Sequence, residues 1–450
     1  MTDKTNETDG TPIPSRRLSR LAGLGGLAVN LAGGMALKGA KQLATGQRPK
    51  ITDLILTPKN ALKITRQLSN MRGAAMKIGQ MISMESGDFL PKEFADILAQ
   101  LRSDARNMPK AQLQKVLTSE WGHDWLAQFA YFKHYPIAAA SIGQVHRAET
   151  HDGDVLAIKV QYPGVRESID SDVNNVASLL SMTGLVPAHL DIKPLIEEGR
   201  KQLHQEADYL REAKYLQQFA ALVSDDAHFA VPEYYPDLST DRVLAMSYIE
   251  SHPIEELVDA PQEVRNQIVS RLFKLLLREL FEFQLMQTDP NFANYRFNPD
   301  TDQIVLLDFG ATREIDTDLV EAYRNMVKTV LYGDSEDCLN AAIEMGFAPN
   351  NIPPEFKSVI LEIIDIALAP IRRDAPFDFR DTQIATDIRD KAMDLALKRD
   401  LWHLPPPETV FIQRKIGGIY MLATRLQARV NIRALMERYL GQEIFKDEGS

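Results

Sequence analysis

The sequence predicts an α+β fold in which a small β-containing lobe is followed by a larger helical lobe. Two short apolar runs suited to buried strands, Val155–Gln161 and Val243–Tyr248, lie in the first part of the chain. From Leu319 onward the pattern is almost entirely helical, with interruptions at Pro353–Pro354 and Pro405–Pro407. Strands that precede a long run of helices favour separate β-containing and helical lobes.

The composition is that of a soluble globular protein, because 44% of the 450 residues are hydrophobic and 25% are charged. The net charge of −11 argues against a nucleic-acid partner, which would need a basic face for its phosphates. Cys338 is the only cysteine, so an intrachain disulfide and a thiolate-rich metal site are excluded. We expect Cys338 to be a buried small residue. The nine histidines show no H-x-x-x-H spacing, so no zinc site is expected.

The N-terminal region combines an acidic arm with an uncharged, glycine-rich stretch. Residues 1–14 predict a disordered arm, and their acidic, apolar-poor start is unlike a signal or transit peptide. Leu21–Leu37 is uncharged and is flanked by arginines and lysines. Its 17 residues are at the short limit for a spanning helix, so packing on its own domain or peripheral membrane contact is favoured.

Hydrophobic periodicity places several helices and divides the chain. The predicted helices are Thr57–Ser86, Pro91–Leu101, Pro109–Leu117, Asp191–Phe219 and Pro261–Leu285. We therefore predict four parts: a disordered arm (1–14), a helical extension (15–127), a small β-containing lobe (128–250) and a helical lobe (251–450).

Three separated motifs carry the candidate chemistry. The first is Lys159, in the strand sequence LAIK. The second is Asp289–Asn294, whose first and last residues are an aspartate and an asparagine five positions apart. The third is Asp308–Gly310, the sequence DFG, directly after the short apolar run Ile304–Leu307. Each motif alone is a weak signal, but their order along the chain is the order that a protein-kinase core requires.

The chemistry of these groups suits a nucleotide with a metal ion. A strand lysine such as Lys159 can reach the α- and β-phosphates of ATP as a point charge. Asn294 and Asp308 offer oxygen ligands to Mg²⁺, and Asp289 lies where a group orients the attacking atom. We therefore predict a protein-kinase-like bilobal fold that binds ATP and Mg²⁺.

Two features differ from an ordinary protein kinase. No glycine-rich loop precedes the lysine strand, and its place is taken by Ala138, Ala139, Ala140 and Ser141. Alanine restricts φ more than glycine and keeps a Cβ near the phosphates, so the nucleotide should be held differently. No A-P-E sequence follows the DFG motif, so no long activation segment is expected to seat a peptide.

These motifs together resemble the UbiB family of atypical kinases. Besides the residues above, the resemblance rests on Lys77–Gln80 (K-x-G-Q), Gln205–Asp208 (Q-E-x-D) and Arg414–Gly418 near the end of the chain. It extends from about Pro14 to the C-terminus.

The resemblance implies roles that the spacing alone does not. Lys77 would lie over the active site and meet Glu206 and Asp208, and Glu212 would be the helix carboxylate that pairs with Lys159. Asp208 and Glu212 are four residues apart on the predicted Asp191–Phe219 helix, which would put them on one face.

The nucleotide is expected to contact a further part of the chain. We expect Met246–Glu250 to form a hinge between the lobes, and Met246 and Tyr248 are candidate nucleotide contacts. The alanine-rich loop is the other expected contact.

Three hypotheses for function remain open from the sequence. The first, which the resemblance to the UbiB family implies, is an atypical kinase or ATPase that supports ubiquinone biosynthesis, with ubiquinone precursors or quinone-biosynthesis enzymes as partners. The second is a pseudokinase that binds nucleotide only to change shape and scaffold a biosynthetic complex. The third is a conventional Ser/Thr kinase, against which the missing glycine loop and A-P-E sequence count.

The expected location is the cytoplasm of a bacterium, with peripheral association at the inner membrane. An acidic protein with a basic N-terminal segment suits contact with an anionic membrane surface. A homodimer is left open.

Overall fold

The computed structural model describes residues 65, 68–69, 71, 73–79, 107–183, 192–381, 383–396 and 406–444. The chain divides into two units, which are described separately: unit 1 comprises residues 1–217 and 233–248, and unit 2 comprises residues 218–232 and 249–450. The arm 1–14, the stretch Leu21–Leu37 and the expected helix Pro91–Leu101 lie outside the described residues.

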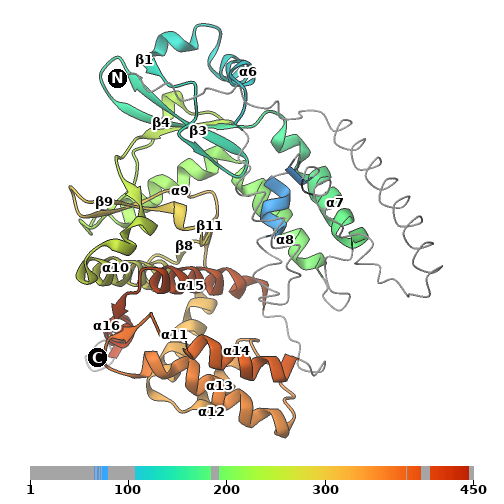
Figure 1. Ribbon diagram of the computed structural model, residues 1–450, viewed down its shortest axis with the longest axis vertical. Helices are drawn as coiled ribbons and strands as arrows, with labels where there is room; N and C mark the ends of the chain where they lie inside the picture. Colours follow the sequence, from blue (N-terminus) through green and yellow to red (C-terminus); the bar gives the residue numbers. More distant parts are fainter. Residues whose placement is uncertain are drawn as a thin grey trace, which may run out of the picture. The chain divides into compact units, whose positions relative to one another are not determined.

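Unit 1 is built on an antiparallel sheet with the strand order β1-β3-β4-β6, and β2 pairs with β3. The elements in and beside this sheet, drawn in Figure 1, are α6 (Lys110–Trp121), η2 (Trp125–Gln128), β1 (Phe129–Phe132), β2 (Ala138–Ala139), β3 (Gly143–Thr150), β4 (Val155–Gln161), η3 (Pro236–Leu238) and β6 (Val243–Ser247). The central strand β4 has the bounds predicted from its apolar run, and β6 ends one residue earlier than predicted.

Aromatic side chains fill the core beside this sheet. The rings of Trp125 and Phe132 meet edge to face at 5.0 Å, and Trp121 lies 5.4 Å from Phe129. These residues surround buried leucine, isoleucine and valine side chains of α6, β4 and β6. The two tryptophans therefore pack a core, which is the ordinary role of aromatic residues at helical spacing.

The helical part of unit 1 follows the sheet strand β4. Its helices are α7 (Val165–Thr183), α8 (Lys193–Glu206) and the first part of α9 (Tyr209–Leu222), and α7 and α8 lie side by side (Figure 1). Residues 73–79 are also helical, as predicted for the segment around Lys77. The prediction of one continuous helix over Asp191–Phe219 is wrong, because the chain breaks between α8 and α9 at Ala207 and Asp208.

Unit 2 joins short strands to a helical layer. Its four-stranded sheet has the order β5-β10-β9-β7, and a separate antiparallel pair joins β8 to β11. The strands and 3₁₀ turns are β5 (Phe229–Ala230), β7 (His252–Pro253), η4 (Ile254–Asp259), β8 (Leu285–Gln287), η5 (Phe292–Asn294), β9 (Tyr295–Asn298), β10 (Gln303–Leu306), β11 (Thr312–Glu314), β12 (Phe377–Asp378) and β13 (Arg429–Val430).

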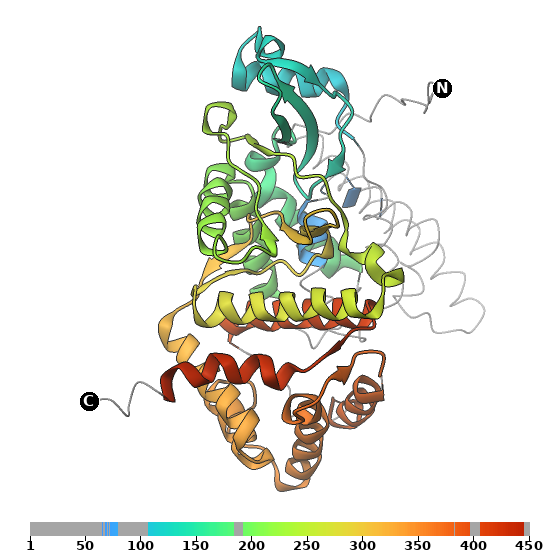
Figure 2. The same ribbon diagram turned by 90° about the vertical axis from the view of Figure 1, so that its left-hand side faces the viewer.

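The helices of unit 2 are α10 (Gln262–Phe281), α11 (Thr317–Tyr332), α12 (Ser335–Glu344), α13 (Pro354–Arg372), α14 (Gln383–Ala396), α15 (Pro407–Arg425) and α16 (Ile432–Ile444). Helices α11, α15 and α16 contact α10, whose residues from Leu275 to Phe281 are all buried, and α13 packs on α12 and α14. Helices α10 and α15 run side by side (Figure 2). Two of the proline interruptions mark helix starts, because α13 begins at Pro354 and α15 at Pro407, where the missing N–H costs nothing.

Two further expectations concern single features of the chain. Cys338 is a free, buried cysteine, as predicted, and burial raises the pKa of its thiol. None of the helices in the described ranges has both the length and the apolar character needed to cross a membrane.

A buried histidine lies within the sheet of unit 1. His146 on β3 is fully buried, its ring stacks on Phe132 at 5.5 Å, and its two nitrogens meet the Gln144 side chain and the Lys133 carbonyl. Burial lowers the pKa of His146 from 6.5 to about 4.

This pKa predicts a loss of stability in mild acid. The unfolded chain takes up a proton below pH 6.5 while folded His146 resists until about pH 4, so the stabilisation is complete above pH 6.5 and is lost as the pH falls towards 4. When the pH falls from 7 to 5, the free energy of unfolding should decrease in the wild type by about 2 kcal/mol more than in His146→Gln. Urea unfolding followed by tryptophan fluorescence measures this difference. Replacement of the exposed His151 by Gln is the control and should keep the wild-type dependence; equal pH dependence in His146→Gln would contradict the prediction.

Candidate active site

Lys159 of β4 is held in unit 1 by a buried ion pair. Its Nζ donates to both carboxylate oxygens of Glu212 on α9, at 2.8 and 2.9 Å, and the side chains are only 8% and 2% exposed. The ring of Tyr209 lies 5.2 Å from the same ammonium. The pair that the resemblance implied is therefore present, and it fixes the position of the lysine head group against the sheet.

The alanine-rich segment is a hairpin rather than an open loop. Ala138 and Ala139 form β2 and pair with Val145 and Gln144 of β3, and the Ala140 N–H donates to the carbonyl of Gly143 at 2.9 Å. Gly143 closes the turn where a Cβ would lie 2.5 Å from the Val160 carbonyl oxygen. Only glycine permits this close approach of the hairpin to β4.

Glu206 joins this hairpin to the helix that carries Lys77. Lys77, which is 4% exposed, forms an ion pair with one carboxylate oxygen of Glu206. The Ser141 hydroxyl donates to the other oxygen at 2.9 Å. One carboxylate thus connects the end of α8, the turn between β2 and β3, and the helical segment 73–79.

Asp208 has a different neighbourhood from the one expected on a continuous helix. Its carboxylate accepts a hydrogen bond of 3.0 Å from the backbone N–H of Arg211, so it caps the start of α9. The break therefore separates Glu206, at the end of α8, from Asp208 and Glu212, whereas the Glu212 N–H still donates to the Asp208 carbonyl at 3.0 Å, as in one helical turn. Asp208 directly precedes α9, from which Glu212 reaches Lys159.

Met246 and Tyr248 lie at the end of the small sheet. Met246 belongs to β6 and is 8% exposed, and the Tyr248 N–H donates to the Val155 carbonyl at 2.8 Å. The boundary between the two units follows Tyr248. Their role as nucleotide contacts stays a prediction.

In unit 2, a hairpin brings two of the predicted metal ligands to one end. β9 pairs with β10 so that Tyr295 lies opposite Leu306. Asn294 precedes β9 and Leu307 follows β10, and the Leu307 N–H donates to the Asn294 carbonyl at 2.9 Å. Asp308 is the next residue, so the asparagine and the aspartate emerge from neighbouring strand ends.

Hydrogen bonds define the conformation of the Asp289 loop. The Asn294 amide nitrogen donates to Asp289 Oδ2 at 3.2 Å, and the Asn291 N–H donates to Asp289 Oδ1 at 3.3 Å. The Asn291 side chain in turn accepts from the Ala293 N–H at 3.2 Å. Because the amide nitrogen of Asn294 is directed at Asp289, its amide oxygen faces the other way and can act as a ligand.

Asp308 adopts a backbone conformation that non-glycine residues rarely take. Its φ is +60°, and its carboxylate accepts a hydrogen bond of 3.2 Å from the Gly310 N–H. The next residue, Phe309, is buried against Phe219 with ring centroids 5.0 Å apart. Left-handed residues cluster at functional sites, where the surrounding structure holds them in place.

Known proteins are similar to this chain over most of its length. The model of the ABC1 atypical kinase-like domain matches residues 100–342, which is more than half of the chain. The mitochondrial atypical kinase COQ8 of Saccharomyces cerevisiae is 37% identical over 444 residues, covering 98% of this chain and 88% of the relative. The mitochondrial atypical kinase COQ8B of Rattus norvegicus is also 37% identical, over 94% of this chain and 80% of the relative.

The chain belongs to the ABC1 atypical kinase-like family, the UbiB/COQ8 family. Among solved structures, Rv3197 of Mycobacterium tuberculosis, determined with erythromycin, aligns with a TM-score of 0.58 over 85% of this chain and 96% of that one. Its 24% sequence identity makes this a likeness of fold. The α+β, protein-kinase-like fold predicted from the sequence is thereby confirmed.

Two residues of this ABC1 chain contact the Asp289 loop region without having been singled out as site residues. Lys415 on α15 is 1% exposed and bonds Gln287 and Glu279, and Gly418 on the same helix packs against Pro290. Burial acts to lower the pKa of Lys415, but the adjacent Glu279 carboxylate and Tyr295 outweigh it and raise that pKa. The motif Arg414–Gly418 was the available signal, but it lies more than 100 residues from the loop and gave no indication of its contacts.

The described residues offer oxygen donors rather than a dense metal cluster. Within the described ranges, no group of three or more histidine, cysteine, aspartate or glutamate side chains could hold a metal ion. An amide oxygen and a carboxylate, Asn294 and Asp308, suit Mg²⁺ because this ion keeps several waters and takes few protein ligands when it also binds phosphates.

The buried pair in unit 1 predicts a strong effect of losing its carboxylate. Glu212→Gln leaves the Lys159 ammonium in its buried position without the charge that balances it, and should lower the free energy of unfolding by about 3–5 kcal/mol. Replacing both residues, as Lys159→Met with Glu212→Leu, should recover much of this loss.

Chemical denaturation of each variant measures the effect. Asp241→Asn provides the control, because Asp241 pairs with Arg166 at 3.6 Å with both side chains exposed and should cost less than about 1 kcal/mol. Equal losses for Glu212→Gln and Asp241→Asn would contradict the assignment of a buried ion pair.

Proposed function

We propose that this chain binds Mg-ATP and acts as an atypical kinase or ATPase that supports ubiquinone biosynthesis at a membrane surface. Membership of a family of atypical kinases supports the enzyme class, and the resemblance to the UbiB family supports the biosynthetic role. The observation that carries the proposal is the β9–β10 hairpin, from whose one end Asn294 and Asp308 emerge while Asp289 is bonded to Asn294.

The side chains of Lys159, Asn294 and Asp308 are of the types that bind phosphate and Mg²⁺, and Asn294 and Asp308 emerge from neighbouring strand ends. Mg²⁺ bound with ATP would neutralise charge on the β- and γ-phosphates. Asn294 and Asp308 would be its protein ligands through their oxygens. Lys159 would hold the α- and β-phosphates, and Glu212 would orient the lysine that does so.

The remaining groups have positioning roles in this proposal. Asp289 would orient the attacking hydroxyl or water, and its hydrogen bonds to Asn291 and Asn294 fix its carboxylate in one orientation. Glu206 would restrain the alanine-rich hairpin through Ser141 while holding Lys77. A restrained hairpin and the absence of an A-P-E sequence favour hydrolysis, or transfer to a small acceptor, over transfer to a peptide.

Removal of the Asp308 carboxylate tests this function directly. Asp308→Asn should lower the rate of phosphate release from ATP, with Mg²⁺ and membrane lipid present, by at least about 100-fold, because the anionic ligand of the metal is replaced by a neutral amide. The matched control is Asp300→Asn, an exposed aspartate in the turn of the same hairpin, which should keep the wild-type rate.

The outcomes of this assay separate the hypotheses. If the wild type releases no phosphate, or if Asp308→Asn releases phosphate at the wild-type rate, the proposal that this chain is an enzyme is wrong. Nucleotide-dependent capture of biosynthetic partners without turnover would support the pseudokinase scaffold in its place.

Peripheral contact with an anionic membrane is the second element of the proposal. The basic residues on both sides of Leu21–Leu37 would attract anionic headgroups, each by about 1 kcal/mol. Deletion of residues 1–45 should therefore abolish most co-sedimentation with phosphatidylserine-containing liposomes at low salt. Neutral liposomes are the control, and equal sedimentation of both proteins with anionic liposomes would exclude the N-terminal segment as the contact.

A further inference from the structure

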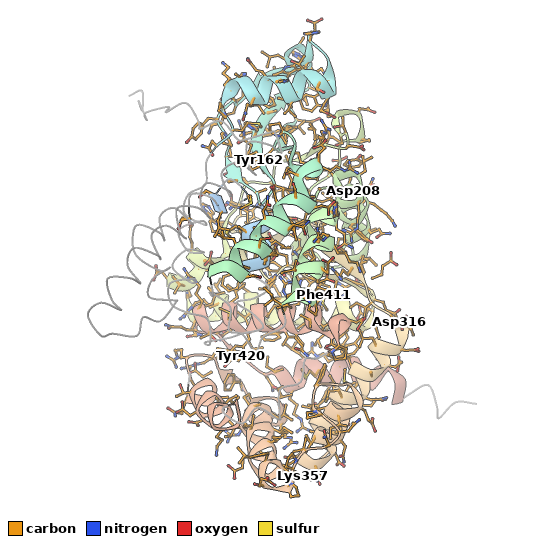
Figure 3. The ribbon with its side chains drawn as sticks, turned by 90° about the vertical axis from the view of Figure 1, so that its right-hand side faces the viewer. Tyr162, Asp208, Asp316, Lys357, Phe411 and Tyr420 are labelled. Atoms are coloured by element: carbon orange, nitrogen blue, oxygen red, sulfur yellow. The ribbon has the colours of Figure 1, made fainter. Side chains whose placement is uncertain are left out.

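Helix α15 lies outside the segment that matches the family domain but contacts the candidate site in unit 2. The match ends at residue 342, and α15 begins at Pro407. Phe411 and Tyr420, labelled in Figure 3, mark the course of this helix beside α10. Three contacts join α15 to the strands and loop that carry Asp289 and Asp308.

The first contact is made by the buried Lys415. Its Nζ donates to the Gln287 backbone carbonyl at 2.8 Å and to the Gln287 side-chain oxygen at 3.3 Å. Glu279 of α10 balances the charge, with its two carboxylate oxygens 3.2 and 3.0 Å from Nζ. The ammonium therefore ties the end of β8, two residues before Asp289, to both helices.

Gln287 extends this contact to Asp308. While its side-chain oxygen faces Lys415, its amide nitrogen donates to the Asp308 carbonyl at 3.2 Å. Thr288 adds a hydrogen bond of 2.7 Å from its hydroxyl to the Ala311 carbonyl. The chain segments before Asp289 and around Asp308 are thus bonded to one another and, through Gln287, to Lys415.

The second contact needs the absence of a side chain. A methyl group at Gly418 would lie 2.5 Å from Pro290 Cβ, so the backbone of α15 packs directly on the residue that follows Asp289. At the neighbouring Gly417 a methyl group would meet no atom within 4 Å. The two glycines of one helix therefore differ in their environment, although both favour the same backbone conformation.

The third contact stabilises the strand on the other side of the DFG motif. The guanidinium of Arg313 in β11 lies 3.6 Å from the ring centroid of Phe411 on α15. Because β11 pairs with β8 through Thr312 and Gln287, this contact and that of Lys415 hold the same pair of strands.

We infer that α15 is the platform that positions Asp289 and Asp308 for the proposed reaction, with Lys415 and Gly418 as positioning residues. Neither residue is placed in contact with the reacting atoms. Lys415 fixes the position of the end of β8 by its hydrogen bond to the Gln287 carbonyl. Gly418 allows the backbone of α15 to lie against Pro290. This inference rests on the proposed function for its effect on rate, but not for its effect on the conformation of the loop.

The two glycines provide a matched test in the full-length protein. In Gly418→Ala, Pro290 must retreat by about 1 Å to reach an ordinary carbon–carbon separation, so amide hydrogen exchange over residues 288–294 should rise at least about tenfold. Gly417→Ala raises the helix propensity by the same amount without a clash, so its amide hydrogen exchange over residues 288–294 should equal that of the wild type. Indistinguishable exchange over residues 288–294 in the two variants would overturn the inference.

A kinetic measurement separates positioning from nucleotide binding. Gly418→Ala should lower kcat for phosphate release by about 10- to 100-fold while the KM for ATP stays within about threefold, because a shift of about 1 Å misplaces the reacting groups. Gly417→Ala should keep kcat. If Gly418→Ala raises hydrogen exchange over residues 288–294 but the wild type releases no phosphate, the proposed function is rejected. The inference that α15 positions the loop is then still supported.

Lys415 is tested with a pair of substitutions that leaves no charge buried. Lys415→Met alone leaves the buried Glu279 carboxylate without a balancing charge, so this variant is expected to unfold readily. Lys415→Met with Glu279→Leu removes both charges and should fold. The double variant lacks the bond to Gln287, so raised exchange over residues 288–294 is expected in it as well. Wild-type exchange in the folded double variant would show that the pair only stabilises the fold and would overturn the positioning role of Lys415.

Discussion

A lysine ammonium that is removed from water needs a carboxylate beside it, and the candidate site depends on this constraint in each unit. Lys159 is paired with Glu212 and Lys415 with Glu279, and all four side chains are almost completely buried. Burying a charge pair is costly, and apolar residues of the same volume would often be as stable. The pairs therefore have an effect that apolar packing could not provide: each fixes a strand of the site by a directional bond.

The two pairs act at different points of the candidate chemistry. In unit 1 the lysine is itself the candidate ligand of phosphate, and α9 supplies the carboxylate that orients it. In unit 2 the lysine donates to the backbone of β8. Gln287, Pro290 and the β8–β11 pair connect this contact to the candidate ligands. Loss of the first pair should therefore affect nucleotide binding, whereas loss of the second should affect the rate of reaction.

Much of the fold could be predicted because the strands that carry the site are local, apolar runs. β4 has its predicted bounds, and the helix α10 differs from its predicted limits only at the ends. The break between α8 and α9 could not be predicted from periodicity, since the apolar pattern continues across it. At this break the Arg211 N–H donates a hydrogen bond to the Asp208 carboxylate, which caps the start of α9. The convergence of Lys159 with Asn294 and Asp308 on one nucleotide stays a prediction.

The contacts of α15 with the loop that carries Asp289 show why sequence motifs alone could not identify every residue of the candidate site. Gly418 and Gly417 are identical in type and adjacent in the chain, yet only the former faces Pro290. That distinction depends on how α15 is rotated about its axis, and α15 is joined to α10 by the buried pair of Lys415 and Glu279. The same rotation points Lys415, three residues before Gly418, at Gln287, because residues three apart share one face of a helix. The boundary of a sequence domain at residue 342 therefore does not coincide with the boundary of the unit that holds Asp289 in place.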